Sequence, residues 1–153
     1  MFSNVYPREK YLNRIRPFYH SDIIKVITGI RRCGKSFVLR AITNELTDSG
    51  IDSDSILYLP LDRRGFKYIK TPEQLEEKIE SMLGEKDFYY LFIDEVQNVE
   101  GFESVVQAYA EEVFSLFLTY ISKNSPTSIS GGMNCHIGHG NTRTFVLVFP
   151  VFL

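Results

Sequence analysis

The sequence predicts an α/β protein whose mostly parallel sheet lies between two layers of helices. Three observations support this prediction. A glycine-rich segment at 29–36 follows an apolar run, a second apolar run at 88–93 ends in two acids, and stretches of strand character alternate with amphipathic helical stretches. Strands that alternate with helices are joined by right-handed crossovers, so neighbouring strands run parallel. A chain of 153 residues is long enough to bury one such core.

The glycine-rich segment fits the Walker A pattern G-x-x-x-x-G-K-[ST]. Its glycines allow a tight curl that turns backbone N–H groups toward an anion, Lys35 can reach the β- and γ-phosphates, and the Ser36 hydroxyl can ligate Mg²⁺. A match to this pattern can occur by chance, so the residues before and after the segment decide whether it is a Walker A loop. The residues expected to contact the nucleotide are Gly29, Ile30, Arg31, Arg32, Cys33, Gly34, Lys35, Ser36 and Phe37.

The flanks of this segment supply the strand and the helix that the motif requires. Residues 23–28 are rich in β-branched side chains and predict a buried parallel strand. From Phe37 to Leu46, apolar residues spaced three and four apart predict a helix, which ends in the turn formers of 47–50. A helix that begins at the loop directs its positive end at bound phosphates.

The second apolar run, at 88–93, ends in Asp94 and Glu95 and has the Walker B form. Ligands of open α/β sheets bind at the carboxyl ends of the strands, where these two acids are expected. Asp94 would hold the Mg²⁺ shell, and Glu95 would orient and polarise a water in line with the γ-phosphate. A strand that ends in two acids is common by itself, but together with the glycine-rich loop it predicts a nucleotide site.

Other stretches complete the alternating pattern. The third helix has a well-formed start, because Thr71 is a good N-cap, Pro72 suits the first turn and Gln74 follows three residues after the cap. A helix over 102–109 rests on an apolar stripe. The predicted bounds are 7–15 for a helix, 55–61 for a strand, 71–83 and 102–109 for helices, and 114–119 for a strand.

Composition excludes several other classes. Charged residues make up 24% of the chain and the net charge is −2, so no overall basic character argues for nucleic acid. No apolar run approaches the roughly 18 residues that span a bilayer, and the N-terminus has no secretory pattern. The two cysteines lie far apart and do not suggest a disulfide framework. We expect a cytoplasmic protein without a membrane partner.

The two motifs and their flanks resemble those of prokaryotic AAA-type ATPases whose P-loop reads G-x-R-R-x-G-K-S and whose Walker B reads I-D-E-V-Q. The resemblance covers roughly residues 8 to 119. It implies ATP rather than GTP, and a P-loop NTPase fold in which a sensor strand separates the Walker A and Walker B strands. It also implies conformational work on a protein or DNA partner, a lid and a winged-helix-like C-terminal region, and homo-oligomers in full-length members.

The resemblance ends after Thr119. Family members continue as F-L-T-G-S-N-S with a sensor asparagine, whereas Asn124 of this chain either loops back as the sensor or is an ordinary loop residue. Residues 122–144 are rich in Ser, Gly and Asn and predict a flexible loop; the alternative is a tail that is truncated or out of register. Residues 144–153 predict a fifth strand beside the Walker A strand. The chain is thus expected to be a single, incomplete AAA-type core over 1–153.

Two functional classes remain open. The first is an ATP-hydrolysing domain with Lys35 and Glu95 as catalytic residues, and ATP with Mg²⁺ at Ser36 and Asp94 as its cofactors. The second is a truncated module that binds ATP with little or no turnover. A small-molecule phosphotransferase is disfavoured by the Asp-Glu pair and the absent lid arginines.

Two further features near the C-terminus carry residues of a kind found in functional sites. A zinc site from Cys135, His136 and His139 with distant Cys33 lacks a recognised ligand spacing. Arg143 is the only arginine near the C-terminus, and the sequence gives it no defined place in the site.

Overall fold

The structure of the protein, a computed structural model, describes residues 9–112, 114–121 and 146–151. The helices are α1 (Glu9–Ile15), α2 (Lys35–Asp48), α3 (Pro72–Met82) and α4 (Phe102–Ala110), with short 3-10 turns at Arg16–Phe18, Ser53–Ser55 and Val96–Asn98. The strands are β1 (Ile24–Gly29), β2 (Ile56–Pro60), β3 (Tyr89–Asp94), β4 (Phe114–Ile121) and β5 (Val146–Pro150). Strands and helices alternate through most of the chain, as the sequence predicts.

The five strands form one sheet in the order β2-β3-β4-β1-β5, and every neighbouring pair is parallel. β4 lies between β1, which leads into the glycine-rich loop, and β3, which ends in the acids. This order confirms the predicted P-loop NTPase fold with a sensor strand between the Walker A and Walker B strands. The pairing of β5 with β1 confirms the expected fifth strand.

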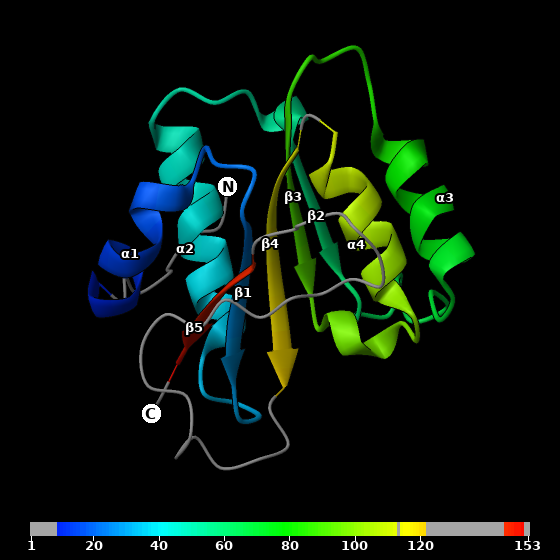
Figure 1. The fold of residues 1–153 in the computed structure, drawn as a ribbon, viewed down its shortest axis with the longest axis horizontal. Coiled ribbons are helices and arrows are strands. Elements are labelled where there is room, and N and C mark those ends of the chain that lie inside the picture. Colours follow the sequence, from blue (N-terminus) through cyan, green and yellow to red (C-terminus); the bar gives the residue numbers. More distant parts are fainter. Residues whose placement is uncertain (1–8, 113, 122–145, 152–153) are drawn as a thin grey trace.

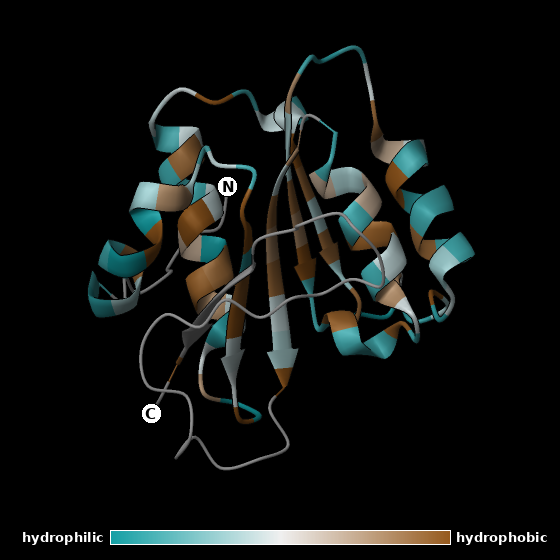
Figure 2. Ribbon diagram, in the orientation of Figure 1, coloured by the Kyte–Doolittle hydropathy of each residue, from teal (hydrophilic) through white to brown (hydrophobic). Residues whose placement is uncertain are grey.

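Helices cover both faces of the sheet, so the fold has three layers (Figure 1). One face packs against α1 and α2 and buries, among others, Leu12, Ile15, Leu39 and Ile42. The opposite face packs against α3 and α4 and buries, among others, Leu75, Ile79, Val105 and Val106. In Figure 2 the strands are mostly hydrophobic, whereas α1 and α3 carry many hydrophilic residues. Burial of these two apolar surfaces stabilises the sheet between the helical layers.

A row of side chains crosses the sheet on the face that packs against α2. Tyr58, Phe92, Phe117 and Lys25 are register partners on β2, β3, β4 and β1. The rings of Phe92 and Phe117 stack with centroids 4.6 Å apart, and Lys25 Nζ lies 4.4 Å from the Phe117 centroid. Because side chains alternate between faces along a strand, the next residues on this face are Asp94 of β3 and Thr119 of β4.

Lys25 is fully buried, and within the described residues its ammonium forms no ion pair. Its ammonium donates to Ser115 Oγ at 2.6 Å and to Ser21 O at 3.0 Å. Burial lowers the pKa of Lys25 to about 7, although the negative charge of Asp22 opposes this shift.

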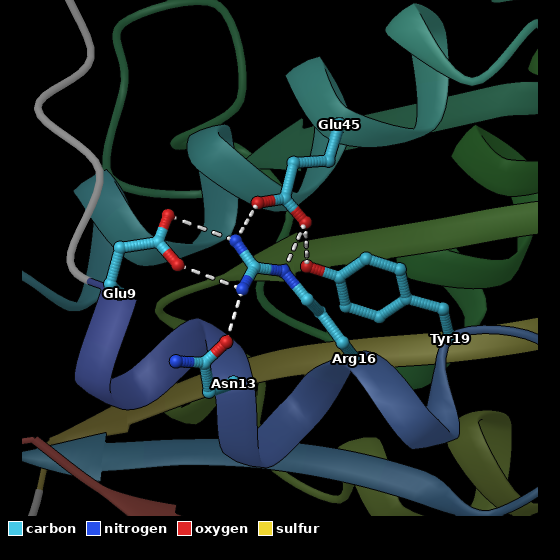
Figure 3. A network of polar contacts seen from close by, with 5 residues as sticks. All are labelled: Glu9, Asn13, Arg16, Tyr19 and Glu45. Carbon is cyan, nitrogen blue, oxygen red and sulfur yellow. Dashed lines mark hydrogen bonds and ion pairs between the residues drawn. The ribbon is translucent and has the colours of Figure 1, made fainter.

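Arg16, in the 3-10 turn after α1, donates hydrogen bonds to acidic side chains of both α1 and α2 (Figure 3). The Arg16 guanidinium donates to the Glu9 carboxylate at 2.8 Å and to the Glu45 carboxylate at 2.6 Å, and it also contacts Asn13. Tyr19 donates to Glu45 as well, at 2.7 Å. The hydrogen bonds from Arg16 to Glu45 and Glu9 raise the arginine's pKa. The network therefore joins the beginning of α1 to the last turns of α2.

Some element bounds differ from those predicted. β1 begins at Ile24 and includes Gly29, and β4 extends to Ile121 instead of ending at Thr119. The reason is pairing, since Gly29 and Ile121 are register partners in the β1–β4 ladder. The start of α3 is as predicted, with a capping box between Thr71 and Gln74, but the helix ends at Met82.

Several predictions fall outside the described residues. These concern the loop at 122–144 and the side chains of Asn124, Cys135, His136, His139 and Arg143. Across the described part of the chain, no helix is both long and apolar enough to cross a membrane.

Candidate functional site

The glycine-rich loop connects the carboxyl end of β1 to the first turn of α2. Gly29 is the last residue of β1, and Gly34 caps the N-terminus of α2 with a φ of 95°. Arg32 also has a positive φ, of 64°, which is uncommon for a residue with a Cβ. The Cys33 N–H donates to Ile30 O at 3.3 Å. The loop therefore makes a tight turn directly before α2.

Gly29 is required by the close approach of two neighbouring groups. A Cβ on Gly29 would collide with Cys33 Sγ and would lie 2.7 Å from Val151 O. Cys33 is fully buried in the core between the sheet and α2. Cys33 is one of the residues expected to contact the nucleotide, but its side chain points into the core. Its backbone alone is therefore in a position to face a ligand of the loop.

Lys35, the first residue of α2, turns its side chain back over the loop. The residue is 3% exposed, and its ammonium donates to Ile30 O at 2.9 Å. Cys33 Sγ lies 3.9 Å from the same nitrogen. A lysine ammonium has three N–H donors, so the bond to Ile30 does not use up its capacity.

Most of the other residues expected to contact the nucleotide are exposed to solvent. Ile30 and Phe37 are 46% and 49% exposed. Arg31 and Arg32 are also exposed, and Ser36 is half-buried in the first turn of α2. The open side of the loop thus carries two cationic side chains, a hydroxyl and the positive end of a helix.

Asp94 is the last residue of β3 and is 2% exposed, and its carboxylate accepts hydrogen bonds from both neighbouring strands. Oδ1 accepts a hydrogen bond from Thr119 Oγ1 of β4, and Oδ2 accepts one from the Tyr58 hydroxyl of β2 at 3.3 Å. Burial and the charge of Asp94 raise the pKa of Tyr58, despite an opposing hydrogen bond with Arg40. The phenol therefore stays protonated and remains a donor at neutral pH.

Glu95 follows the strand in a left-handed conformation, with φ 60° and ψ 50°. Its N–H donates to Thr119 Oγ1 at 2.7 Å. Its carboxylate accepts a hydrogen bond from Gln97 Nε2, while Gln97 Oε1 accepts from the Ile121 N–H at 3.4 Å. Both the backbone and the side chain of Glu95 are thus connected to β4.

The loop and the two acids lie at the same edge of the sheet because β1, β4 and β3 are parallel neighbours. Two strand spacings, about 10 Å, separate the ends of β1 and β3. The sequence predicted this grouping of Lys35, Ser36, Asp94 and Glu95. It did not predict the contact of Tyr58 with Asp94 or that of Gln97 with Glu95. In the sequence Thr119 is only a match to the family motif, although its spacing of two from Phe117 puts both residues on one face of the strand.

A parallel sheet, a glycine-rich loop between β1 and α2, and two acids at the end of β3 define a P-loop α/β domain. A family model described as an AAA domain matches residues 21–133, and the chain belongs to this family.

Two curated relatives are uncharacterized proteins. One, from Haemophilus influenzae, is 38% identical over 102 residues, which are 66% of this chain and 26% of that protein. The other, from Methanocaldococcus jannaschii, is 31% identical over 113 residues, which are 71% of this chain and 24% of that protein. The chain therefore spans about a quarter of the length of these relatives.

Among solved structures, the chain is similar to a DNA polymerase III gamma subunit-related protein from Thermotoga maritima. The identity is 14%, the TM-score is 0.45, and the match covers 72% of this chain and 39% of that one.

Proposed function

We propose that this chain binds ATP with Mg²⁺ at the carboxyl edge of its sheet and hydrolyses the ATP. The observation that carries the proposal is the placement of the glycine-rich loop and of the Asp94–Glu95 pair on the two sides of β4. Phosphates bound in the loop would lie within reach of acids at the end of β3. Membership of the AAA domain family supports the same function.

Lys35 supplies the charge that binds the phosphates. Its ammonium now donates to Ile30 O, a neutral acceptor within its own loop. A bound triphosphate would offer anionic acceptors in its place, and charge-assisted hydrogen bonds are roughly twice as strong as neutral ones. The N–H groups of the loop and the positive end of α2 would contact the same phosphates.

The residues present fit a magnesium site. Asp94 offers a carboxylate with two neutral donors already in place, and Ser36 offers a half-buried hydroxyl. Oxygen ligands of this kind, with several waters, are what Mg²⁺ prefers beside a nucleotide. When bound, the ion would neutralise negative charge on the phosphate oxygens.

Glu95 would polarise the attacking water. Glu95 directly follows the buried end of β3, so it lies at the same carboxyl end of the sheet as Asp94, the proposed magnesium ligand. ATP turnover would then drive conformational work on a protein or DNA partner in the cytoplasm, in a longer protein that forms homo-oligomers. The greater length of both curated relatives supports a longer protein.

One observation favours the alternative of ATP binding with little turnover. Thr119 is the polar side chain that β4 places next to Asp94, and its hydroxyl already donates to Asp94 and accepts from the Glu95 N–H. This hydroxyl is therefore already engaged by the two acids and is not available to contact a γ-phosphate.

Titration of the purified chain with ATP and Mg²⁺, with phosphate release followed in the same sample, tests both versions. Lys35→Ala should abolish nucleotide binding, and Glu95→Gln should retain binding and lose hydrolysis. Lys10→Ala, at an exposed lysine of α1, is the matched control. An unchanged affinity for ATP in a folded Lys35→Ala variant would contradict the assignment of the nucleotide site to the glycine-rich loop. Binding without phosphate release would select the alternative.

A further inference from the structure

Thr119 connects the two acids of the site through one buried hydroxyl. The residue is fully buried in β4, and its Oγ1 donates to Asp94 Oδ1 while it accepts from the Glu95 N–H at 2.7 Å. A hydroxyl carries a single proton. Because that proton points at Asp94, the oxygen lone pairs are free to accept from Glu95, and both bonds are made at once.

The second oxygen of Asp94 is held from the opposite side. Tyr58 of β2 donates to Oδ2 at 3.3 Å. Donors from β2 and β4 therefore contact the two oxygens of one carboxylate from the two neighbouring strands, which restricts its rotation. An ionised carboxylate has about four lone-pair sites, so two remain for the waters of a metal ion.

The backbone at Glu95 needs the support that Thr119 gives. A φ of 60° is uncommon for a residue with a Cβ, and such conformations persist only where the surroundings fix them. The bond from the Glu95 N–H to Thr119 is one such restraint, and the bond from the Asn98 N–H to Glu95 O at 3.0 Å is another. Thr119 thus also sets the direction in which the chain leaves β3.

We propose that Thr119 and Tyr58 are positioning residues for magnesium, which hold the Asp94 carboxylate from two strands in the orientation that receives the metal-bound waters. The inference rests on the proposed function, because it concerns the Mg²⁺ that accompanies ATP. Neither residue needs to touch the nucleotide. Their effect on ATP binding is confined to the part of the affinity that Mg²⁺ adds.

The test measures binding of a non-hydrolysable fluorescent ATP analogue to the full chain, once with excess Mg²⁺ and once with EDTA. The ratio of the two affinities is the gain from Mg²⁺. Thr119→Val, which keeps the shape but removes the hydroxyl, should reduce this gain about tenfold, as is usual when a residue that orients a metal ligand is lost. Its affinity in EDTA should stay at the wild-type value. Thr119→Ser should retain most of the gain.

A matched control is available in α2. Thr43 is also fully buried, but its hydroxyl donates to Arg40 O within its own helix at 2.7 Å. Thr43→Val should leave the gain from Mg²⁺ unchanged. Tyr58→Phe, which removes only the longer hydrogen bond, should reduce the gain about threefold.

The possible outcomes separate the two proposals. Wild-type gain in a folded Thr119→Val variant, or an equal loss of affinity with Mg²⁺ and with EDTA, would overturn the positioning role while leaving ATP binding intact. If Thr119→Val does not fold, unchanged gain in Tyr58→Phe overturns the inference instead. A wild-type protein that binds no ATP under either condition would overturn the proposed function and this inference with it.

Discussion

The side-chain amide of Gln97 joins the Glu95 carboxylate to the last residue of β4. Its nitrogen donates to Glu95 Oε2, and its oxygen accepts from the Ile121 N–H at 3.4 Å. The proposed water-activating group is therefore oriented by a neighbour two residues away, which itself is held by the sensor strand. This arrangement has a measurable consequence for turnover.

Gln97→Ala should lower kcat about tenfold and leave ATP affinity near the wild-type value, since the amide orients the base but not the phosphates. Steady-state kinetics and ATP titration measure these two parameters, and Gln107→Ala in α4 is the control. Unchanged kcat in Gln97→Ala contradicts the assignment.

Gly29→Ala should destabilise the protein by about 1–3 kcal/mol, the usual cost of an overpacked site. The new methyl would meet Cys33 Sγ and the Val151 carbonyl, and a backbone carbonyl cannot rotate away. Nucleotide affinity should fall as well, because the loop would have to shift. Urea unfolding and ATP titration test the two effects. Gly65→Ala is the matched control, as nothing lies within 4 Å of its added Cβ; equal stability of the two variants would contradict the prediction.

Arg16→Ala should destabilise the chain by about 1–2 kcal/mol, because it removes charge-assisted bonds to two carboxylates at a partly exposed site. Salt should diminish the difference, since these charges are accessible to screening. Arg14→Ala, at an exposed position of the same helix, should change stability by less than about 0.5 kcal/mol. Urea unfolding at low and high salt provides the measurement. A salt-independent loss would assign the effect to packing of the arginine stem.

Lys25 should make the stability rise with pH. Its pKa in the folded protein is about 7, against an ordinary value of 10.5, so between these limits the unfolded chain binds more protons. The free energy of unfolding therefore rises as pH increases from 7 toward 10.5, by up to about 1.4 kcal/mol per pH unit. Below pH 7 the residue is charged in both states and contributes no slope.

Lys25→Met should lack this slope. The difference in unfolding free energy between wild type and Lys25→Met should grow in favour of the wild type from pH 7 to pH 9.5. Groups that titrate in both proteins cancel in this difference. Lys10→Met, at an exposed lysine, should follow the wild-type curve. Parallel curves for wild type and Lys25→Met would show that the buried amine stays protonated.

The sequence was sufficient for those features that depend on local order. The glycines, Lys35 and the apolar spacing after Phe37 lie within one stretch, so the loop and its helix were predictable. The sheet order followed from the resemblance to AAA-type ATPases. The bonds of Thr119 and Tyr58 to Asp94 depend on strands that meet only in the folded sheet, as does the extension of β4 to Ile121. Nor did the P-loop pattern indicate that the Cys33 side chain is buried.

β4 is hydrogen-bonded along both of its edges, and helices cover both faces of the sheet. Amides in such a strand exchange with solvent only when the whole domain opens. Hydrogen exchange at residues 115–118 should therefore report the global free energy of unfolding. Nucleotide binding would slow exchange there through mass action alone, even where the ligand makes no contact with the strand.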